Sequence, residues 1–164
     1  MSHGARAPPH RGGPRPSNPK GEATMACGTN LVVRGLSTWF CCGNAWGPCG
    51  ATGHGACGTC NSGSHQYAWP NASDACKSIT RPQDCGLSLP RYTCGHTFYV
   101  TNRCNSRCVS VKLADCGPDT NSFCNQQHCC GSTCGKNRVI DLTASAFSAI
   151  ADLSTGIRPV RIDN

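Results

Sequence analysis

The chain has little of what normally builds a large hydrophobic core. Leu, Ile, Val and Phe together number 23 of 164 residues, about 14%, whereas charged chains with less than roughly 20% of these residues are typically disordered. No stretch approaches the roughly 20 apolar residues of a transmembrane helix, which excludes such a span. The chain is interrupted throughout by 19 glycines and 11 prolines, which excludes a long coiled coil.

Cysteine, by contrast, is abundant. Sixteen cysteines lie between residues 27 and 134, and a chain so poor in aliphatic residues is expected to be held together by cross-links. A zinc ribbon would need two Cys-x-x-Cys pairs to present four thiolates, whereas only Cys57 and Cys60 have this spacing. We therefore predict disulfides rather than a structural metal, with no cofactor, although the sequence does not reveal their pairing. The cysteines concerned are Cys27, Cys41, Cys42, Cys49, Cys57, Cys60, Cys76, Cys85, Cys94, Cys104, Cys108, Cys116, Cys124, Cys129, Cys130 and Cys134.

The N-terminal segment differs in composition from the rest. Residues 1–26 contain five prolines, and they lack the apolar stretch of a signal peptide. This composition is typical of a flexible basic tail. We predict such a tail over residues 1–26, followed by one domain over residues 27–164. An extracytoplasmic, secreted location is inferred from the cysteines alone, because disulfides persist in oxidising compartments.

The charge is strongly positive, with a net value of +7 and 15 basic residues. Such a balance favours anionic partners in general. The arginines of this chain, however, are scattered singly, without a basic run and without interleaved aromatic residues. We therefore interpret the charge as a solvated surface and expect no nucleic-acid partner.

Strand patterns are clearest after residue 95. Residues 96–102 combine β-branched and aromatic side chains, which predicts a strand. Residues 109–115 alternate between apolar and polar side chains, which predicts a second strand. By the same alternation Asp115 falls on the apolar face at the end of its strand, where an acid is uncommon unless it has a function.

The last part of the chain predicts a strand, a helix and a closing strand. Residues 139–142 form a short apolar strand, and Thr143 is placed to cap a helix from Ala144 to about residue 152. Gly156 is placed near the C-terminal turn of that helix. Residues 157–162 then form the closing strand.

Together, residues 109–118 (VSVKLADCGP) and 139–162 (VIDLTASAFSAIADLSTGIRPVRI) resemble the double-psi β-barrel of RlpA-like, expansin-like and barwin-like proteins. That family has a strand ending in Asp-x-Gly-Pro or Asp-x-Cys-Pro, then an Asp-Leu-Ser/Thr strand, a helix with Ala-Phe and a final strand. Looser likenesses lie upstream in residues 37–40, 55–58 and 98–102. The resemblance implies a mainly β, six-stranded double-psi barrel with one short helix in its C-terminal half and extensive disulfide bonding.

The resemblance implies different chemistry for different branches of the family. Endoglucanases on this barrel invert with two aspartates, one directly before a Cys-Cys pair and the other in the Asp-Leu strand. Asp141 matches the second aspartate, but Phe40 stands before Cys41 and Cys42, where the base would be. Inversion needs an acid and a base roughly 6.5–9.5 Å apart. This route is therefore not expected.

Expansin-like members keep the aspartate of the Asp-Leu-Ser strand and lack the hydrolase base, which is the combination found here. The resemblance therefore implies a monomeric, wall-loosening protein that binds a cell-wall polysaccharide (peptidoglycan, cellulose or chitin) without hydrolysing it. In such a groove aromatic rings stack on sugar faces and acids bind hydroxyl groups. The candidate residues are Trp39, Phe40, Trp46, Tyr67, Trp69, Asp115 and Asp141.

Two other functions stay open, so the sequence does not decide whether the protein is an enzyme. An RlpA-like peptidoglycan lytic transglycosylase needs one acid that protonates the leaving oxygen and then acts as a base. The resemblance assigns this catalytic role to Asp115 or Asp141. Small disulfide-rich barrels also serve as protein-binding modules, such as protease inhibitors or effectors. Each candidate also has a structural interpretation, in which the acids bind backbone amides and the tryptophans pack over disulfides.

Overall fold

The computed structural model describes parts of the chain from Cys27 onward. The described residues are 27–43, 49, 52–72, 76, 83–84, 87–118, 129–132, 134–135 and 138–164. The predicted tail and Trp46 lie outside them. Within the described residues no helix has the length and apolarity needed to cross a membrane.

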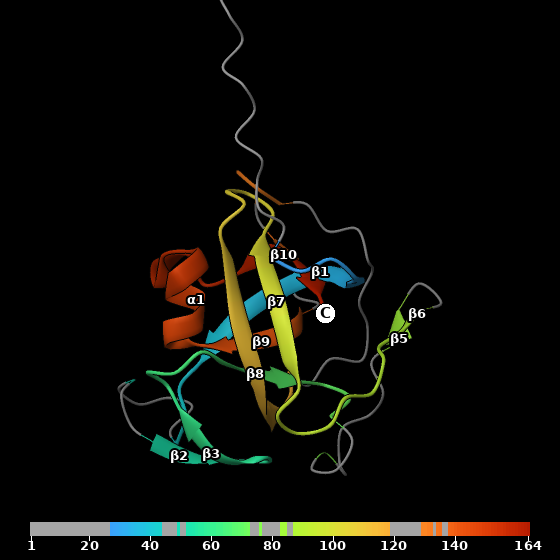
Figure 1. Ribbon diagram of the computed structural model, residues 1–164. Coiled ribbons are helices and arrows are strands. Elements are labelled where there is room, and N and C mark those ends of the chain that lie inside the picture. The colour runs from blue at the N-terminus through green and yellow to red at the C-terminus, as the bar shows by residue number, and fades with distance from the viewer. Residues whose placement is uncertain are drawn as a thin grey trace, which may run out of the picture.

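Six strands close into a barrel in the order β1-β10-β7-β8-β4-β9 (Figure 1). β1 is parallel to β9, β4 is parallel to β8, and the other four neighbouring pairs are antiparallel. The mainly β, six-stranded barrel expected from the sequence is thereby confirmed. The strand bounds are β1 Leu31–Phe40, β4 Gln66–Trp69, β7 Thr97–Asn102, β8 Cys108–Cys116, β9 Arg138–Thr143 and β10 Arg158–Asp163.

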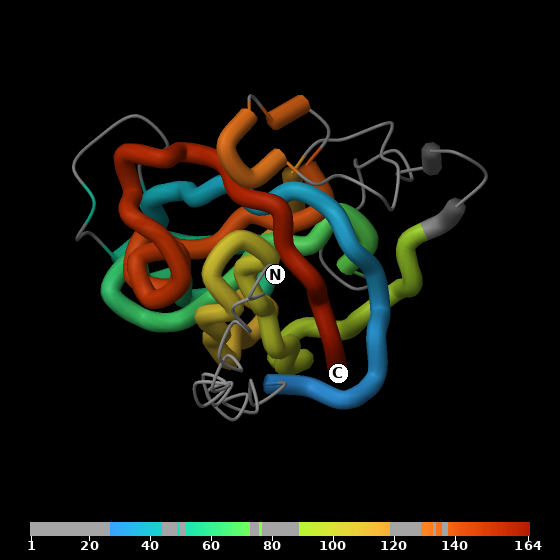
Figure 2. Tube along the Cα trace, turned by 90° about the horizontal axis from the view of Figure 1, so that it is seen from above, coloured from blue at the N-terminus to red at the C-terminus, as the bar shows by residue number. Residues whose placement is uncertain are grey.

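Short elements surround the barrel. The helix α1 packs against β8, β9 and β1, and it lies along one side of the barrel in Figure 1. Figure 2 shows the first barrel strand following the last one along the outside of the fold, as their antiparallel pairing requires. The short elements are β2 Thr52–Gly55, β3 Gly58–Asn61, β5 Gln83–Asp84, β6 Leu87–Ser88, α1 Ala144–Ile150 and the 3-10 turn η1 Leu153–Thr155.

The helix differs in two details from its prediction. It ends at Ile150 rather than near residue 152, and the separate turn η1 follows it. Gly156, with φ of 68°, ends that turn instead of the helix. Thr143 precedes the helix, but its side chain makes no capping bond. The Thr143 hydroxyl instead accepts a hydrogen bond from the amide of Gln66 at 3.1 Å, so this residue ties the helix start to β4.

The alternation predicted for β8 breaks near its end. Val109, Val111 and Leu113 face the core as expected, but the pairing register with β4 shifts after Leu113. Ala114 is buried, whereas Asp115 is only half-buried and pairs with Ala68. The expectation that Asp115 lies on the apolar face is therefore wrong. An irregularity of one residue moves the following side chains to the other face of a strand.

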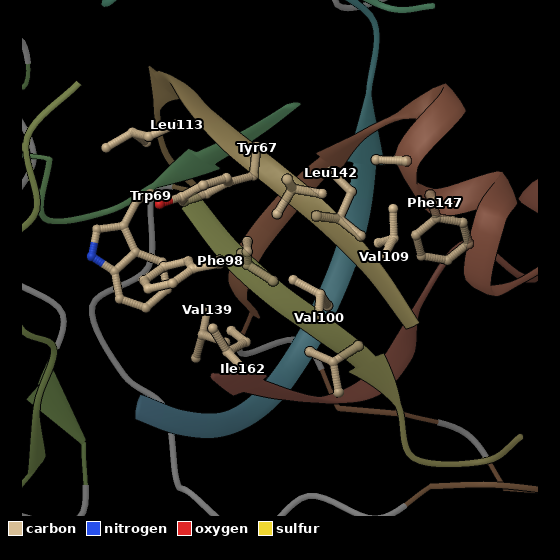
Figure 3. Packing of buried hydrophobic residues seen from close by; sticks show 14 of the residues in the cluster. Tyr67, Trp69, Phe98, Val100, Val109, Leu113, Val139, Leu142, Phe147 and Ile162 are labelled. Atoms are coloured by element: carbon tan, nitrogen blue, oxygen red, sulfur yellow. The ribbon is translucent and has the colours of Figure 1, made fainter. Parts of the chain in front are cut away.

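The barrel core is small, and three of its aromatic side chains gather at one end, whereas Phe147 of α1 lies at the other (Figure 3). Tyr67 and Phe98 stack with ring centroids 4.9 Å apart, and the Trp69 ring meets Phe98 edge to face at 5.0 Å (Figure 3). Aliphatic residues of β7, β8, β9 and β10 fill the rest of the interior. The chain thus concentrates its few large apolar side chains inside one barrel, where each removes the most surface from water.

Disulfides connect the loops to this barrel, as the cysteine content predicts. No described cysteine is free. The seven bonds among described residues are Cys27–Cys108, Cys41–Cys49, Cys42–Cys60, Cys57–Cys94, Cys76–Cys116, Cys104–Cys130 and Cys129–Cys134. Cys85 and Cys124 lie outside the part of the chain that the structure describes.

Candidate functional site

Both candidate acids lie in one row that crosses four neighbouring strands. Thr38 of β1 pairs with Asp141 of β9, and Asp141 pairs with Ala68 of β4. Ala68 in turn pairs with Asp115 of β8. Directly paired residues share a face of a sheet. Because strands are spaced about 4.8 Å apart, two strand spacings place the Cα atoms of the two acids about 10 Å apart.

Asp141 is half-buried and held by one side chain. Its Oδ1 accepts a hydrogen bond from the hydroxyl of Thr38. Burial raises the pKa of Asp141, while the Thr38 hydrogen bond and the positive charge of Arg138 act in the opposite direction. The carboxyl group therefore keeps its proton to a higher pH than an exposed aspartate does.

A cavity of about 390 Å³ lies beside this pair. Thr38 and Arg138 line it together with Cys134, Gly135 and Ile157. Thr38 therefore contacts both the cavity and Asp141. Sequence patterns did not single out Thr38 or Arg138. Thr38 directly precedes Trp39 on β1, and Arg138 lies three residues before Asp141 on β9, which is parallel to β1. These positions indicate a shared site only once the strand register is known.

Asp115 is held by backbone amides. Its Oδ1 accepts hydrogen bonds from the amides of Ala56 and Cys116, both at 2.8 Å. Ala56 belongs to the tip of the β2–β3 hairpin, and the neighbouring amide of Cys57 donates to the carbonyl of Ala114 at 3.0 Å. Gly55 permits this contact, because a Cβ atom there would lie 2.4 Å from the Ala114 carbonyl oxygen. Asp115 thus fastens the hairpin to the end of β8.

Two of the aromatic candidates belong to the core. Tyr67 and Trp69 are both 0% exposed. The Trp69 indole donates to the carbonyl of Pro90 at 2.9 Å, and the Tyr67 hydroxyl lies 3.2 Å from Nδ1 of His96. Their predicted role in lining a groove is therefore wrong, because neither ring presents a face to a ligand. The resemblance placed them in a ligand-binding groove, whereas they lie on β4 inside the barrel.

Two other aromatic candidates lie next to Asp141 at the end of β1. Trp39 and Phe40 are half-buried and pair with Leu142 and Thr143 of β9. The Trp39 indole donates to the carbonyl of Leu153 at 3.1 Å, which fixes the ring against the turn η1. Their predicted role in binding stays a prediction, and Trp46 lies outside the described residues.

No cluster of His, Cys, Asp or Glu able to hold a metal ion occurs among the described residues. The donor set at the row is instead one shielded carboxyl group, one hydroxyl group and one guanidinium group. These groups form hydrogen bonds with hydroxyl groups of a ligand, and a protonated carboxyl group can also donate.

Comparisons with known proteins show a distant likeness of fold. No family model matches the chain, and neither does any curated protein sequence. A Streptomyces papain inhibitor matches with a TM-score of 0.44 and 16% identity, covering 82% of this chain and 100% of that one. An apo expansin of Clavibacter michiganensis matches with a TM-score of 0.45 and 21% identity, covering 79% of this chain. A mutant of a Clavibacter michiganensis expansin in complex with cellohexaose matches with a TM-score of 0.42 and 19% identity, again over 79% of this chain.

This chain spans about half the length of those expansin chains, 48% in each case. The low identities describe fold alone and transfer neither protein's activity to this one.

Proposed function

We propose that this protein is secreted, binds a cell-wall polysaccharide and does not hydrolyse it. The observation that carries the proposal is the Thr38–Asp141 pair beside an open cavity with Arg138 in its wall. Sugars present many hydroxyl groups, and a carboxyl group, a hydroxyl group and a guanidinium group can bind them together. Phe40 is half-buried and lies two residues after Thr38 on β1, so it is the aromatic side chain on the face of this polar set, whereas Trp39 between them packs partly against the core.

The environment of the two acids supports binding without hydrolysis. An inverting hydrolase needs a carboxylate that is free to activate water opposite the acid. In the row, the partner of Asp141 on β1 is Thr38, and its partner on β4 is Ala68. Asp115 lies one strand further, and two backbone amides bind one of its oxygens. Thr38 and Ala68 carry no carboxylate, and Asp115 is bound to the hairpin. We therefore expect none of these three residues to act as that base.

A lytic transglycosylase is the second candidate, and the raised pKa of Asp141 favours it. An acid whose pKa is raised by burial keeps its proton to a higher pH, and such an acid can protonate a leaving oxygen and then take a proton back. This chemistry needs one acid rather than two. Both functions therefore depend on Asp141. They differ in whether the protein cleaves a glycosidic bond of the polysaccharide.

The seven disulfides among the described residues support secretion, because such bonds persist in oxidising compartments. They also fix short loops on a rigid barrel, as in the five-residue separation of Cys129 and Cys134. Rigid loops of this kind suit a protein partner as well. A protein partner is accordingly one outcome of the experiment below.

The test mixes oxidised protein separately with insoluble peptidoglycan, cellulose and chitin, and measures both bound protein and released sugar. We expect binding to one polymer without release. The Asp141→Asn variant should bind about fivefold more weakly, since one hydrogen bond contributes about 1 kcal/mol. Asp152→Asn removes an exposed acid outside the row and is the matched control.

Each other result has a defined meaning. Release of anhydro-muropeptides from peptidoglycan that depends on Asp141 would establish the transglycosylase instead. Binding that Asp141→Asn and Asp152→Asn weaken equally would remove Asp141 from the site. A protein that binds none of the three polymers contradicts the proposal, and titration against papain-like proteases would then test the protein-partner alternative.

A further inference from the structure

A second cavity, of about 310 Å³, lies beside β4 and β8 near the turn that precedes β7. Its volume is at the lower end of the range for small-molecule sites. The exposed side chains around it include Thr59 and Lys112, with Gln66 half-buried between them. Neither Thr38 nor Asp141 lines it, so it is separate from the cavity at the proposed glycan site.

Three oxygen atoms of this cavity already accept hydrogen bonds. The carbonyl of Leu113 accepts from the amide of Gly95 at 3.2 Å, and that of Ala114 accepts from Cys57 at 3.0 Å. Oε1 of Gln66 accepts from a backbone amide of β3 at 2.7 Å. These three acceptors are occupied, whereas the Lys112 ammonium group and the Thr59 hydroxyl group can donate hydrogen bonds.

Lys112 is the charged residue among the described residues that line this cavity. Its stem crosses Gly95, since a Cβ atom at Gly95 would lie 3.4 Å from Cε of Lys112. The salt bridge between described side chains joins Arg161 to Asp163 and does not involve Lys112. The Cys57–Cys94 disulfide borders the cavity and holds its two sides together. An ammonium group, a hydroxyl group and occupied acceptors together favour an anion.

We propose that this cavity binds the carboxylate of an acidic sugar, with the Lys112 ammonium group as its charged partner and the Thr59 hydroxyl as a second donor. This inference rests on the proposed function, because the acidic sugar would be a unit of the bound polysaccharide. Hydrogen bonds between an ammonium group and a carboxylate are stronger than those between neutral groups. A neutral sugar in the same cavity would leave the Lys112 charge without a counter-ion.

Four small sugars test the inference on the full oxidised chain. Glucuronate and N-acetylmuramic acid carry a carboxylate, whereas glucose and N-acetylglucosamine are their neutral counterparts. We expect at least one of the acids, and neither neutral sugar, to shift the amide resonances of Thr59, Gly95 and Lys112 in NMR titrations. Whichever acid binds more tightly identifies the source of the carboxylate as a uronic acid or a muramic acid.

Two variants separate a specific charge from the overall charge of the protein. Lys112→Gln should lower the affinity for the acidic sugar about tenfold or more, since charged hydrogen bonds are lost, and Lys112→Arg should retain most of it. Arg107→Gln removes one positive charge from an exposed turn away from the cavity and is the matched control. Equal loss in Lys112→Gln and Arg107→Gln, or equal binding of acidic and neutral sugars, would overturn the inference.

The outcomes distinguish this inference from the proposed function. If the protein binds a wall polymer through Asp141 but no acidic sugar shifts the cavity resonances, the cavity inference fails and the function stands. If glucuronate or N-acetylmuramic acid binds at Lys112 while no polymer is bound, the site is real and the proposed function fails.

Discussion

Asp115 and Asp141 occupy the same row of the barrel, on either side of Ala68, and yet their surroundings differ. Asp115 accepts hydrogen bonds from two backbone amides, one of which belongs to the β2–β3 hairpin. Asp141 accepts one hydrogen bond, from the hydroxyl group of Thr38, and burial raises its pKa. The first environment suits a side chain that anchors a hairpin, and the second suits a group that exchanges its proton. Residue type alone therefore does not distinguish an anchor from a functional acid.

A disulfide accompanies each acid, and the two disulfides differ in span. Cys57–Cys94 holds the hairpin that binds Asp115 and closes 37 residues. Cys129–Cys134 closes 5 residues, and Cys134 lines the cavity beside Asp141. In the chain-entropy model a longer closed loop stabilises the fold more. The Asp115 region should accordingly depend more strongly on its cross-link than the Asp141 region does.

The largest expected effect comes from removing these disulfides. Replacing Cys57 and Cys94 together by Ser should lower the free energy of unfolding by about 4 kcal/mol, and replacing Cys129 and Cys134 by about 2 kcal/mol. Denaturant unfolding with the other disulfides intact measures both values. If loss of Cys129–Cys134 lowered the free energy of unfolding more than loss of Cys57–Cys94, the expected difference between the two regions would be wrong.

The next largest effect is expected at Asp115 itself. Asp115→Ala removes the acceptor of two backbone amides and should lower the free energy of unfolding by about 2–3 kcal/mol, since hydrogen bonds to charged groups contribute about 1.5–3 kcal/mol. Hydrogen exchange at Ala56 should accelerate at the same time. An Asp115→Ala protein with unchanged stability and unchanged exchange at Ala56 would contradict the anchoring role.

Asp141 should respond to pH in the opposite direction from an anchored carboxylate. Its folded pKa is raised by burial, so its contribution to stability is complete below the unfolded pKa of about 3.9 and is lost as pH rises through the folded pKa. Each unit of the shift corresponds to about 1.4 kcal/mol. Asp141→Asn should abolish this part of the pH dependence and be the more stable protein at neutral pH. Unfolding curves measured from pH 3 to pH 8 provide the test, and parallel curves for both proteins would refute the pKa direction.

The smallest effect is expected at Trp39. Trp39→Phe keeps a ring but loses the indole hydrogen bond to Leu153, which should cost about 1 kcal/mol. Trp39→Ala should in addition weaken polysaccharide binding, since it removes the ring itself. Stability and pull-down binding measured on both variants separate these effects. Binding that Trp39→Ala leaves unchanged would remove Trp39 from the glycan site.

The strands of the C-terminal half could be predicted because their side chains obey a simple period. Strands were predicted over residues 96–102 and 109–115, which contain β-branched side chains. The observed strand β7 is one residue shorter at its start, and β8 is one residue longer at each end. Gln66–Trp69 is only four residues long and lies among glycines and asparagines, so that no period emerges. Its two aromatic side chains were for this reason assigned to a surface that they do not reach.

The site itself was only partly predictable. Asp141 could be selected because its motif is local in sequence. Thr38 lies 103 residues away from it and is brought to it by the parallel pairing of β1 with β9. The side of the strand on which Asp115 lies depends on the register shift at Leu113, which alternation of residue types does not encode. Lys112 gave no signal in the sequence, because a lysine on the polar side of a strand is ordinary.

The order of strands around the barrel also constrains how the chain acquires its structure. The first three barrel strands, β1, β4 and β7, alternate strictly with the last three, β8, β9 and β10. Every strand pair of the barrel thus joins the first group to the second. A ribosome that has released only the first group has released no barrel pair at all, so the barrel must assemble late in synthesis, and such long-range pairing is intrinsically slow. The same interleaving implies that two separately produced halves could form the barrel only by associating with each other.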